Sequence, residues 1–230
     1  MFTYLLLDLG TLLFPLLFSF ESKVQFYRKW KFVVPAILIT AIYFIAWDYF
    51  FTKNGIWSFN PEYLVGNYIS GLPIEEILFF VCVPYACLFI YAVLRDYLML
   101  TVTSVSLNRY LIPFIVFLLV VGIVCRQLTY TSVTFISLAL LLSVLIFLVR
   151  ASYLFVFFTM YVIHLLPFII INGILTALPV VSYNAQYISG FHIGTIPAED
   201  TLYSMLLLLM NVSIYEALQH LAKRRKNNVF

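Results

Sequence analysis

The stretch Leu72-Pro73-Ile74-Glu75-Glu76-Ile77-Leu78-Phe79-Phe80 places two adjacent carboxylates at the start of an apolar run that reaches Leu94. Proline suits the first position of a helix, where its missing N–H costs nothing, so we expect a helix that begins at Pro73. The two glutamates then fall in the first turn, where the helix dipole favours negative charge. A related stretch, Ile196-Pro197-Ala198-Glu199-Asp200-Thr201-Leu202-Tyr203, follows 124 residues later.

The composition of the chain is that of a polytopic membrane protein rather than a soluble domain. Of its 230 residues, 64% are hydrophobic and 10% are charged, with a mean hydropathy of +1.04. No GxGxxG motif follows a strand pattern, and the three histidines are scattered along the chain, so we expect no cofactor and no metal site. We interpret the three cysteines as packing residues.

Seven apolar runs approach the roughly 20 residues that a membrane-spanning helix needs. They cover residues 2–20, 32–51, 73–94, 110–125, 129–149, 151–175 and 197–218. In lipid each run must be helical, because its backbone groups have no water to bond. We therefore predict an all-α polytopic membrane protein with about seven transmembrane helices.

The basic residues predict how this bundle is oriented in the membrane. With seven spans, 11 of the 13 lysines and arginines fall on one side, and only Lys53 and Arg126 fall on the other. Because basic residues favour the cytoplasmic side, we expect a multi-pass protein of the cell membrane with its N-terminus outside and its C-terminus in the cytoplasm.

Most acidic residues lie toward the opposite, outer side. Carboxylates at membrane depth are costly and tend to face a cavity or a partner, so this distribution suggests an acid-lined pocket near the outer boundary. Simple solvation of wet helix ends is the alternative. The residues concerned are Asp8, Asp48, Glu62, Glu75, Glu76, Glu199 and Asp200.

An internal repeat is the strongest signal in the sequence. Residues 45–80 aligned without a gap on residues 169–204 give ten identities in 36 positions, where chance would give about two or three. The first and fifth spans run in the same direction, so we predict two parallel three-helix repeats. The domains are then residues 1–106, a connecting helix in residues 107–128, and residues 129–230.

A family resemblance rests on these same residues. The run Trp47-Asp48 … Gly55-Ile56-Trp57-Ser58-Phe59-Asn60-Pro61, followed by the first acidic stretch, resembles the small membrane lycopene cyclases. In that family, two related subunits or two fused halves cyclise the ends of a linear carotenoid. The second half resembles the partner segment through Asn172-Gly173, Tyr183-Asn184 and the second acidic stretch. It departs at Asp48→Asn172, Glu76→Asp200 and Phe80→Ser204, so the halves are expected to differ chemically.

The resemblance implies a set of site residues. Ring formation needs a carboxylic acid that protonates an alkene, a water-poor cavity, and groups that tolerate a carbocation, which aromatic rings do. Packing or an interfacial aromatic belt is the alternative role for each aromatic residue, and a turn for Asn184. The expected catalytic residues are Glu75, Glu76, Glu199 and Asp200, and the expected substrate-binding residues are Asp48, Trp47, Trp57, Phe79, Phe80, Tyr183, Asn184 and Tyr203.

Two functions of different classes follow. The first is a lycopene β-cyclase-like enzyme, an intramolecular lyase or isomerase that turns lycopene into a β-ring carotenoid. Its partners would be the lipid-soluble carotenoid, the membrane, and a second copy or other carotenoid enzymes, without nucleic acid. The second is a membrane carrier or proton-coupled transporter that uses the acidic cluster as a relay. Parallel repeats and the absence of a charge chain across the membrane disfavour transport.

Overall fold

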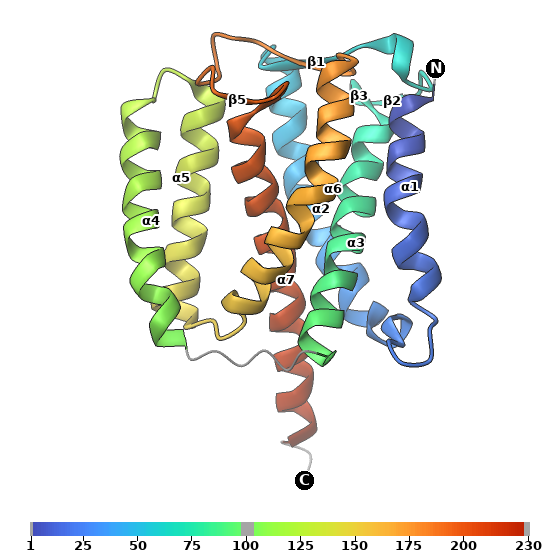
Figure 1. Ribbon diagram of the computed structural model, residues 1–230, viewed down its shortest axis with the longest axis vertical. Helices are drawn as coiled ribbons and strands as arrows, with labels where there is room; N and C mark the ends of the chain where they lie inside the picture. Colours follow the sequence, from blue (N-terminus) through green and yellow to red (C-terminus); the bar gives the residue numbers. More distant parts are fainter. Residues whose placement is uncertain (1, 98–103, 228–230) are drawn as a thin grey trace.

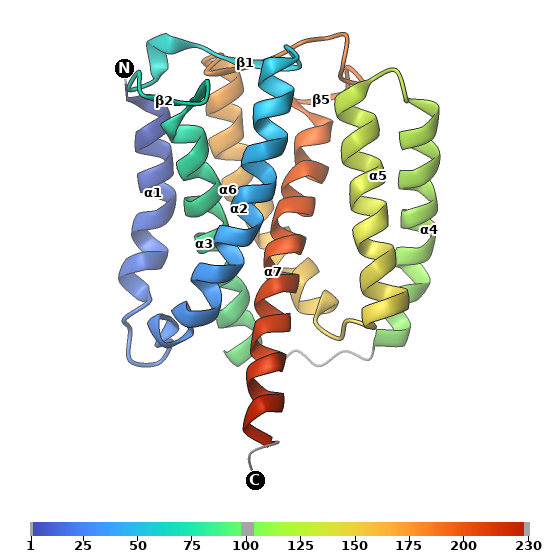
Figure 2. The same cartoon turned by 180° about the vertical axis from the view of Figure 1, so that it is seen from behind.

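The computed structural model describes residues 2–97 and 104–227, and the helices of these residues lie side by side in one bundle, as Figure 1 and Figure 2 show from opposite sides. The predicted all-α polytopic fold is confirmed. In the described part of the chain the α-helices are α1 (Thr3–Phe18), α2 (Trp30–Lys53), α3 (Ile74–Tyr97), α4 (Ser104–Val124), α5 (Thr129–Ser143), α6 (Leu154–Ala177) and α7 (Ala198–Asn227). Shorter helical segments are Phe26–Lys29, Pro61–Tyr63 and Val144–Val149, the last a π-helix that continues α5.

Six of the described helices are long and apolar enough to cross a membrane. The exception is α1, whose 16 residues rise about 24 Å, somewhat less than the roughly 30 Å of a hydrocarbon core. It nevertheless lies alongside the other helices (Figure 2). The chain is therefore a multi-pass membrane protein.

The helix starts differ slightly from the prediction. The sequence predicted that Pro73 and Pro197 begin helices. In the structure they instead end the short strands β3 (Leu72–Pro73) and β6 (Ile196–Pro197). These strands pair with β2 (Tyr68–Ile69) and β5 (His192–Ile193) in two hairpins. Each hairpin keeps the backbone extended through the proline, so the helix begins one residue later.

Two helices are longer than their apolar runs. The helix predicted from residue 110 begins at Ser104, and the one predicted to end at residue 218 continues to Asn227. The added turns contain polar and basic residues, which form helices readily but do not count as apolar. The domain division at residues 106 and 128 stays a prediction, and residues 98–103 of the first domain lie outside the described residues.

The two halves are related by an approximate two-fold axis that runs along the helices. Strand β1 (Trp57–Phe59) pairs antiparallel with β4 (Val181–Tyr183), and Ser58 lies opposite Ser182, its own repeat partner. Helices follow the same rule, because α1 packs on α3 as α5 packs on α7, and α2 packs on α7 as α6 packs on α3. The connecting helix α4 packs on α5. The parallel repeat is therefore visible in space, and the strands of the described residues lie at one end of the bundle, which we call the strand end (Figure 1).

Candidate active site

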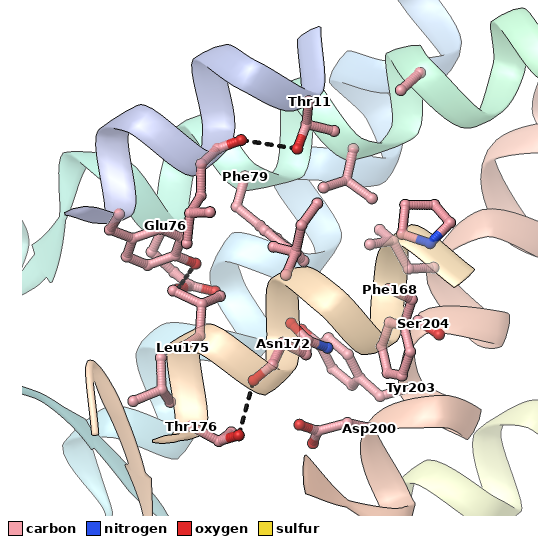
Figure 3. A pocket seen from close by; sticks show the side chains of 18 of the residues that line it. Thr11, Glu76, Phe79, Phe168, Asn172, Leu175, Thr176, Asp200, Tyr203 and Ser204 are labelled. Carbon is pink, nitrogen blue, oxygen red and sulfur yellow. Dashed lines mark hydrogen bonds between the residues drawn. The ribbon is translucent and has the colours of Figure 1, made fainter. Parts of the chain in front are cut away.

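A cavity of about 430 Å³ lies between α1, α3, α6 and α7, under strands β1 and β4 (Figure 3). Helix α3 contributes a stripe with helical spacing to its wall: Glu76, Phe79, Val83, Ala86, Cys87 and Ile90. These residues lie on one helix face because they recur every three or four positions. From Glu76 to Ile90 the stripe extends about 21 Å along the axis. The cavity is thus elongated along α3 and mostly apolar.

Carboxyl groups gather at the strand end of this cavity. The Tyr4 hydroxyl of α1 donates to Glu76 Oε2 at 2.6 Å. The hydroxyls of Tyr130 and Tyr183 donate to Asp200 Oδ1 and Oδ2 at 2.7 and 2.8 Å. Glu76 and Asp200 are repeat partners, and both line the cavity. The two halves therefore bring one acid each to one site, each held by phenol donors.

A third carboxyl, Asp48 of α2, also lines the cavity. It is 1% exposed, and among the described residues its buried Oδ2 has no hydrogen-bond partner. Its repeat partner is Asn172 of α6, which also lines the cavity (Figure 3). The end of the cavity thus combines three carboxyls from α2, α3 and α7.

The first acid of each motif has a different environment. Glu75 Oε1 accepts the backbone N–H of Val65 at 2.6 Å, and Glu199 Oε1 accepts that of Ser189 at 2.6 Å. Val65 and Ser189 are themselves repeat partners, so both halves use the same contact. Thr131 also donates to Glu199 Oε1 at 2.5 Å. Neither Glu75 nor Glu199 is among the residues that line the cavity, and each holds the loop before its helix.

Aromatic rings surround the carboxyl groups. Of the predicted substrate-binding residues, Trp57, Phe79, Tyr183 and Tyr203 line the cavity together with Asp48. Tyr203 packs edge-on against Trp57 and Tyr130, with ring centroids 6.1 and 6.0 Å apart. Burial, together with the Asp200 carboxylate, raises the pKa of the Tyr183 hydroxyl above its usual value, so it remains a hydrogen-bond donor at neutral pH.

The other predicted substrate-binding residues lie elsewhere. Trp47 and Phe80 are buried in the aromatic core beside the cavity, outside its lining. Asn184 is in the loop after β4, where its Oδ1 accepts the backbone N–H of Gln186 at 3.0 Å and its amide donates to Gly55. Asn60 makes the equivalent bond to Glu62. The turn role considered for Asn184 matches these contacts.

Several cavity residues were not among those predicted. Tyr4 and Tyr130 take equivalent places in the two halves but were not found from the repeat. They lie outside the gapless alignment, and they are 126 rather than 124 residues apart. His164 looked isolated in the sequence, yet its Nδ1 lies 3.3 Å from Cys87 Sγ deep in the cavity. Ser204 lines the cavity where its repeat partner is Phe80. Within the described residues, no group of three or more His, Cys, Asp or Glu side chains is arranged to hold a metal ion.

Fold and cavity together define a multi-pass membrane protein with an apolar, acid-tipped cavity suited to an elongated lipophilic molecule. The lycopene cyclase family model matches residues 1–94 and 126–218, and the chain belongs to that family. It is an enzyme family, and its name indicates lycopene cyclase activity. The match covers the three helices of each half and leaves out α4.

The similar curated proteins are fungal. A bifunctional lycopene cyclase/phytoene synthase of Podospora anserina is 27% identical over 88 residues, which is 38% of this chain and 14% of that protein. A protein with the same name in Neurospora crassa is 32% identical over 84 residues, which is 26% of this chain and 14% of that protein. Another in Leptosphaeria maculans is 34% identical over 73 residues, which is 32% of this chain and 12% of that protein. The matched segments thus span only a small part of these relatives. No solved structure matches significantly.

Proposed function

We propose that this chain is an intramolecular lyase or isomerase that cyclises the linear ends of lycopene to β-rings by acid catalysis. The observation that carries the proposal is the convergence of Glu76, Asp200 and Asp48 at one end of a long apolar cavity. An elongated hydrocarbon fits such a cavity, and its terminal double bond would lie beside the acids.

The proposed reaction needs no net oxidation or reduction. A proton adds to the terminal trisubstituted double bond and leaves a tertiary carbocation. The neighbouring alkene attacks this cation, and the new carbon–carbon bond closes a six-membered ring. Loss of a proton from a ring carbon then forms the ring double bond. One proton enters and one leaves, so substrate and product are isomers.

The hydrogen bonds suggest different roles for the two principal acids. Both oxygens of Asp200 accept phenol hydrogen bonds, and such donors stabilise a carboxylate anion. Asp200 therefore suits stabilisation of the cation and acceptance of the ring proton. Glu76 has one oxygen bound by Tyr4, and no hydrogen bond from the described residues reaches its Oε1. It suits the role of proton donor, in the pattern where neighbouring carboxyls take opposite roles.

The aromatic residues of the cavity support the same acid-catalysed mechanism. Trp57, Phe79 and Tyr203 line the cavity around the acids, and ring faces stabilise cations without reacting with them. Residues of both strands β1 and β4 line this end of the cavity, and exclusion of water here would protect a carbocation from side reactions.

The direct test is pigment analysis of cells that make lycopene and express only this chain. We expect carotenoids with β-rings, identified by absorption spectrum and mass. Unchanged lycopene in cells whose membranes contain the full-length protein would contradict the proposal. A Glu76→Gln and Asp200→Asn double variant, accumulated to the same level, is the negative control.

A further inference from the structure

A polar pair of side chains lines the cavity far from the acids. His164 of α6 and Cys87 of α3 both belong to the cavity wall, and the Nδ1 atom of His164 lies 3.3 Å from the Cys87 sulfur. Cys87 follows Glu76 on the same helix and lies about 16 Å further along its axis. An elongated molecule with one end beside the acids therefore passes or reaches this pair.

The second ring nitrogen of His164 has no partner. The side chain is 5% exposed, and among the described residues no group forms a hydrogen bond with its buried Nε2 atom. Tyr161 and Phe168 pack around the imidazole, with ring centroids 5.8 and 5.6 Å from it. A buried polar atom without a partner is unfavourable. The cavity wall thus has one polar atom that a ligand can satisfy.

The contact with Cys87 decides which ligand atom fits. A thiol is a weak donor and its sulfur a weak acceptor, whereas the unprotonated nitrogen of a neutral imidazole accepts hydrogen bonds well. We therefore assign the Cys87 thiol as the donor to Nδ1, and the imidazole proton then lies on Nε2. The unpartnered nitrogen is a hydrogen-bond donor, and its complement is a carbonyl or hydroxyl oxygen.

A purely structural role accounts for only half of this arrangement. Polar contacts between helices stabilise membrane bundles, and the Cys87 contact joins α3 to α6. That contact uses only one of the two ring nitrogens. The repeat partner of His164 is Thr40 of α2, which is buried and lies outside the cavity lining. Only the copy of this position that lines the cavity carries an imidazole.

We propose that His164 binds the oxygen of an oxygenated polyene whose acyclic end lies beside the acids. Its Nε2–H donates to a carbonyl or hydroxyl about 16 Å from that end, so the ligand is a shortened acyclic carotenoid that ends in an aldehyde or an alcohol. Lycopene is a hydrocarbon and leaves Nε2 without a partner. The inference rests on the proposed function for the position of the acyclic end, and it adds a second class of ligand.

Binding of an acyclic polyene aldehyde of this length to the purified protein in detergent tests the inference. The matched probe is the polyene hydrocarbon of the same length. A hydrogen bond to the carbonyl shifts the absorption band of a conjugated aldehyde to longer wavelength. We expect this shift, and an affinity for the aldehyde about tenfold higher than for the hydrocarbon. Equal affinities and an unshifted band would overturn the inference and leave a water molecule as the partner of Nε2.

Variants of His164 show whether the imidazole causes the preference. His164→Phe keeps a ring but removes both nitrogens, so we expect the band shift and the preference for the aldehyde to disappear. His164→Gln keeps an N–H donor and should retain part of both. Thr40→Val is the matched control, because it changes the repeat partner outside the cavity lining, and it should bind both probes as the wild type does.

Unchanged binding of the aldehyde by His164→Phe would overturn the inference. If that variant fails to accumulate, the wild-type band shift and the His164→Gln protein decide. Cyclisation of lycopene by a protein with no preference for the aldehyde would overturn this inference alone. A preference that depends on His164, in a protein that never forms a ring, would overturn the proposed function alone.

Discussion

At the residue scale, the two acids of each motif have different neighbours. Glu76 and Asp200 line the cavity, while Glu75 and Glu199 hold backbone N–H groups of the preceding loops. Adjacent residues on a helix point about 100° apart, so one of each pair faces the cavity and the other faces the loop. The sequence predicts an acidic pair in each half, but which member faces inward depends on loop packing that no local pattern encodes.

We expect Glu76→Gln to lower the cyclisation rate by about 10²–10⁴-fold, the usual loss when a general acid is removed. Glutamine keeps the size of the side chain and an acceptor for the Tyr4 hydroxyl but cannot deliver a proton. The rate is measured as cyclic carotenoid formed per protein in purified membranes. Retention of more than half the wild-type rate would remove Glu76 from the mechanism.

Glu75→Ala provides a contrasting result. The change leaves the Val65 N–H without its carboxylate acceptor, so we expect a lower thermal stability in detergent. The protein that remains folded should still produce cyclic carotenoid. Loss of all product at normal folded protein levels would show that Glu75 takes part in the chemistry.

Tyr183→Phe should lower the rate by about 10- to 100-fold, because a hydrogen bond to a charged group contributes about 1.5–3 kcal/mol. The raised pKa of Tyr183 means that its hydrogen bond is fully present below pH about 10, the ordinary tyrosine value. Its contribution is lost only as the pH rises through the raised value. Ionisation of Tyr183 itself therefore adds no pH dependence to the rate ratio of wild type to variant between pH 6 and about 9, and a variant that keeps the wild-type rate throughout this range would contradict the role.

At the element scale, α1 forms one wall of the cavity, and the cavity opens toward lipid beside this helix. It packs on α3, and its Leu6 is 65% exposed while also lining the cavity. Gly10, one turn further along the same helix, is exposed, lines the cavity, and has no atom within 4 Å of the position of an added Cβ. The cavity therefore reaches the lipid-facing surface beside α1.

We expect Gly10→Leu to slow cyclisation of lycopene dissolved in vesicles by obstructing this opening, while the protein folds normally. Gly173→Leu on α6 is the matched control, since it is also a helical glycine with open space around an added Cβ but lies outside the cavity lining. Initial rates at several lycopene concentrations measure the effect. Equal rates for the two variants would contradict access beside α1.

The helices were predictable from their apolar runs, but the strands were not. The hairpins that precede α3 and α7 have strands of two residues each, too short for an alternating pattern to be detected. Their turns rely on Gly71 and Gly194, both with positive φ, a conformation that glycine adopts easily. These hairpins set where each helix begins, which explains why the prolines were misplaced by one residue.

At the scale of the whole molecule, the basic residues divide between the two ends of the bundle. Lys53 ends α2 at the strand end, and Arg126 lies between α4 and α5 at that end. We predict that the strand end faces outside and the C-terminal end of α7 faces the cytoplasm. Labelling of single cysteines at positions 53 and 223 in intact cells checks the orientation. Labelling of position 223 and not of position 53 would show that the protein has the opposite orientation.

The pairing of β1 with β4 has a further consequence, for the fidelity of the product. Trp57, Phe59, Val181 and Tyr183 of these two strands line the cavity beside the acids, so under the proposed mechanism the strand pair shields the carbocation from water. A tertiary cation reached by water is hydrated to an alcohol instead of closing a ring. Replacing both Ser58 and Ser182 with proline loosens this pairing. We expect such a protein to release a hydrated, ringless carotenoid, visible by mass spectrometry as lycopene plus one water. The three residue pairs between β1 and β4 would then determine whether the product is a cyclic carotenoid or an alcohol.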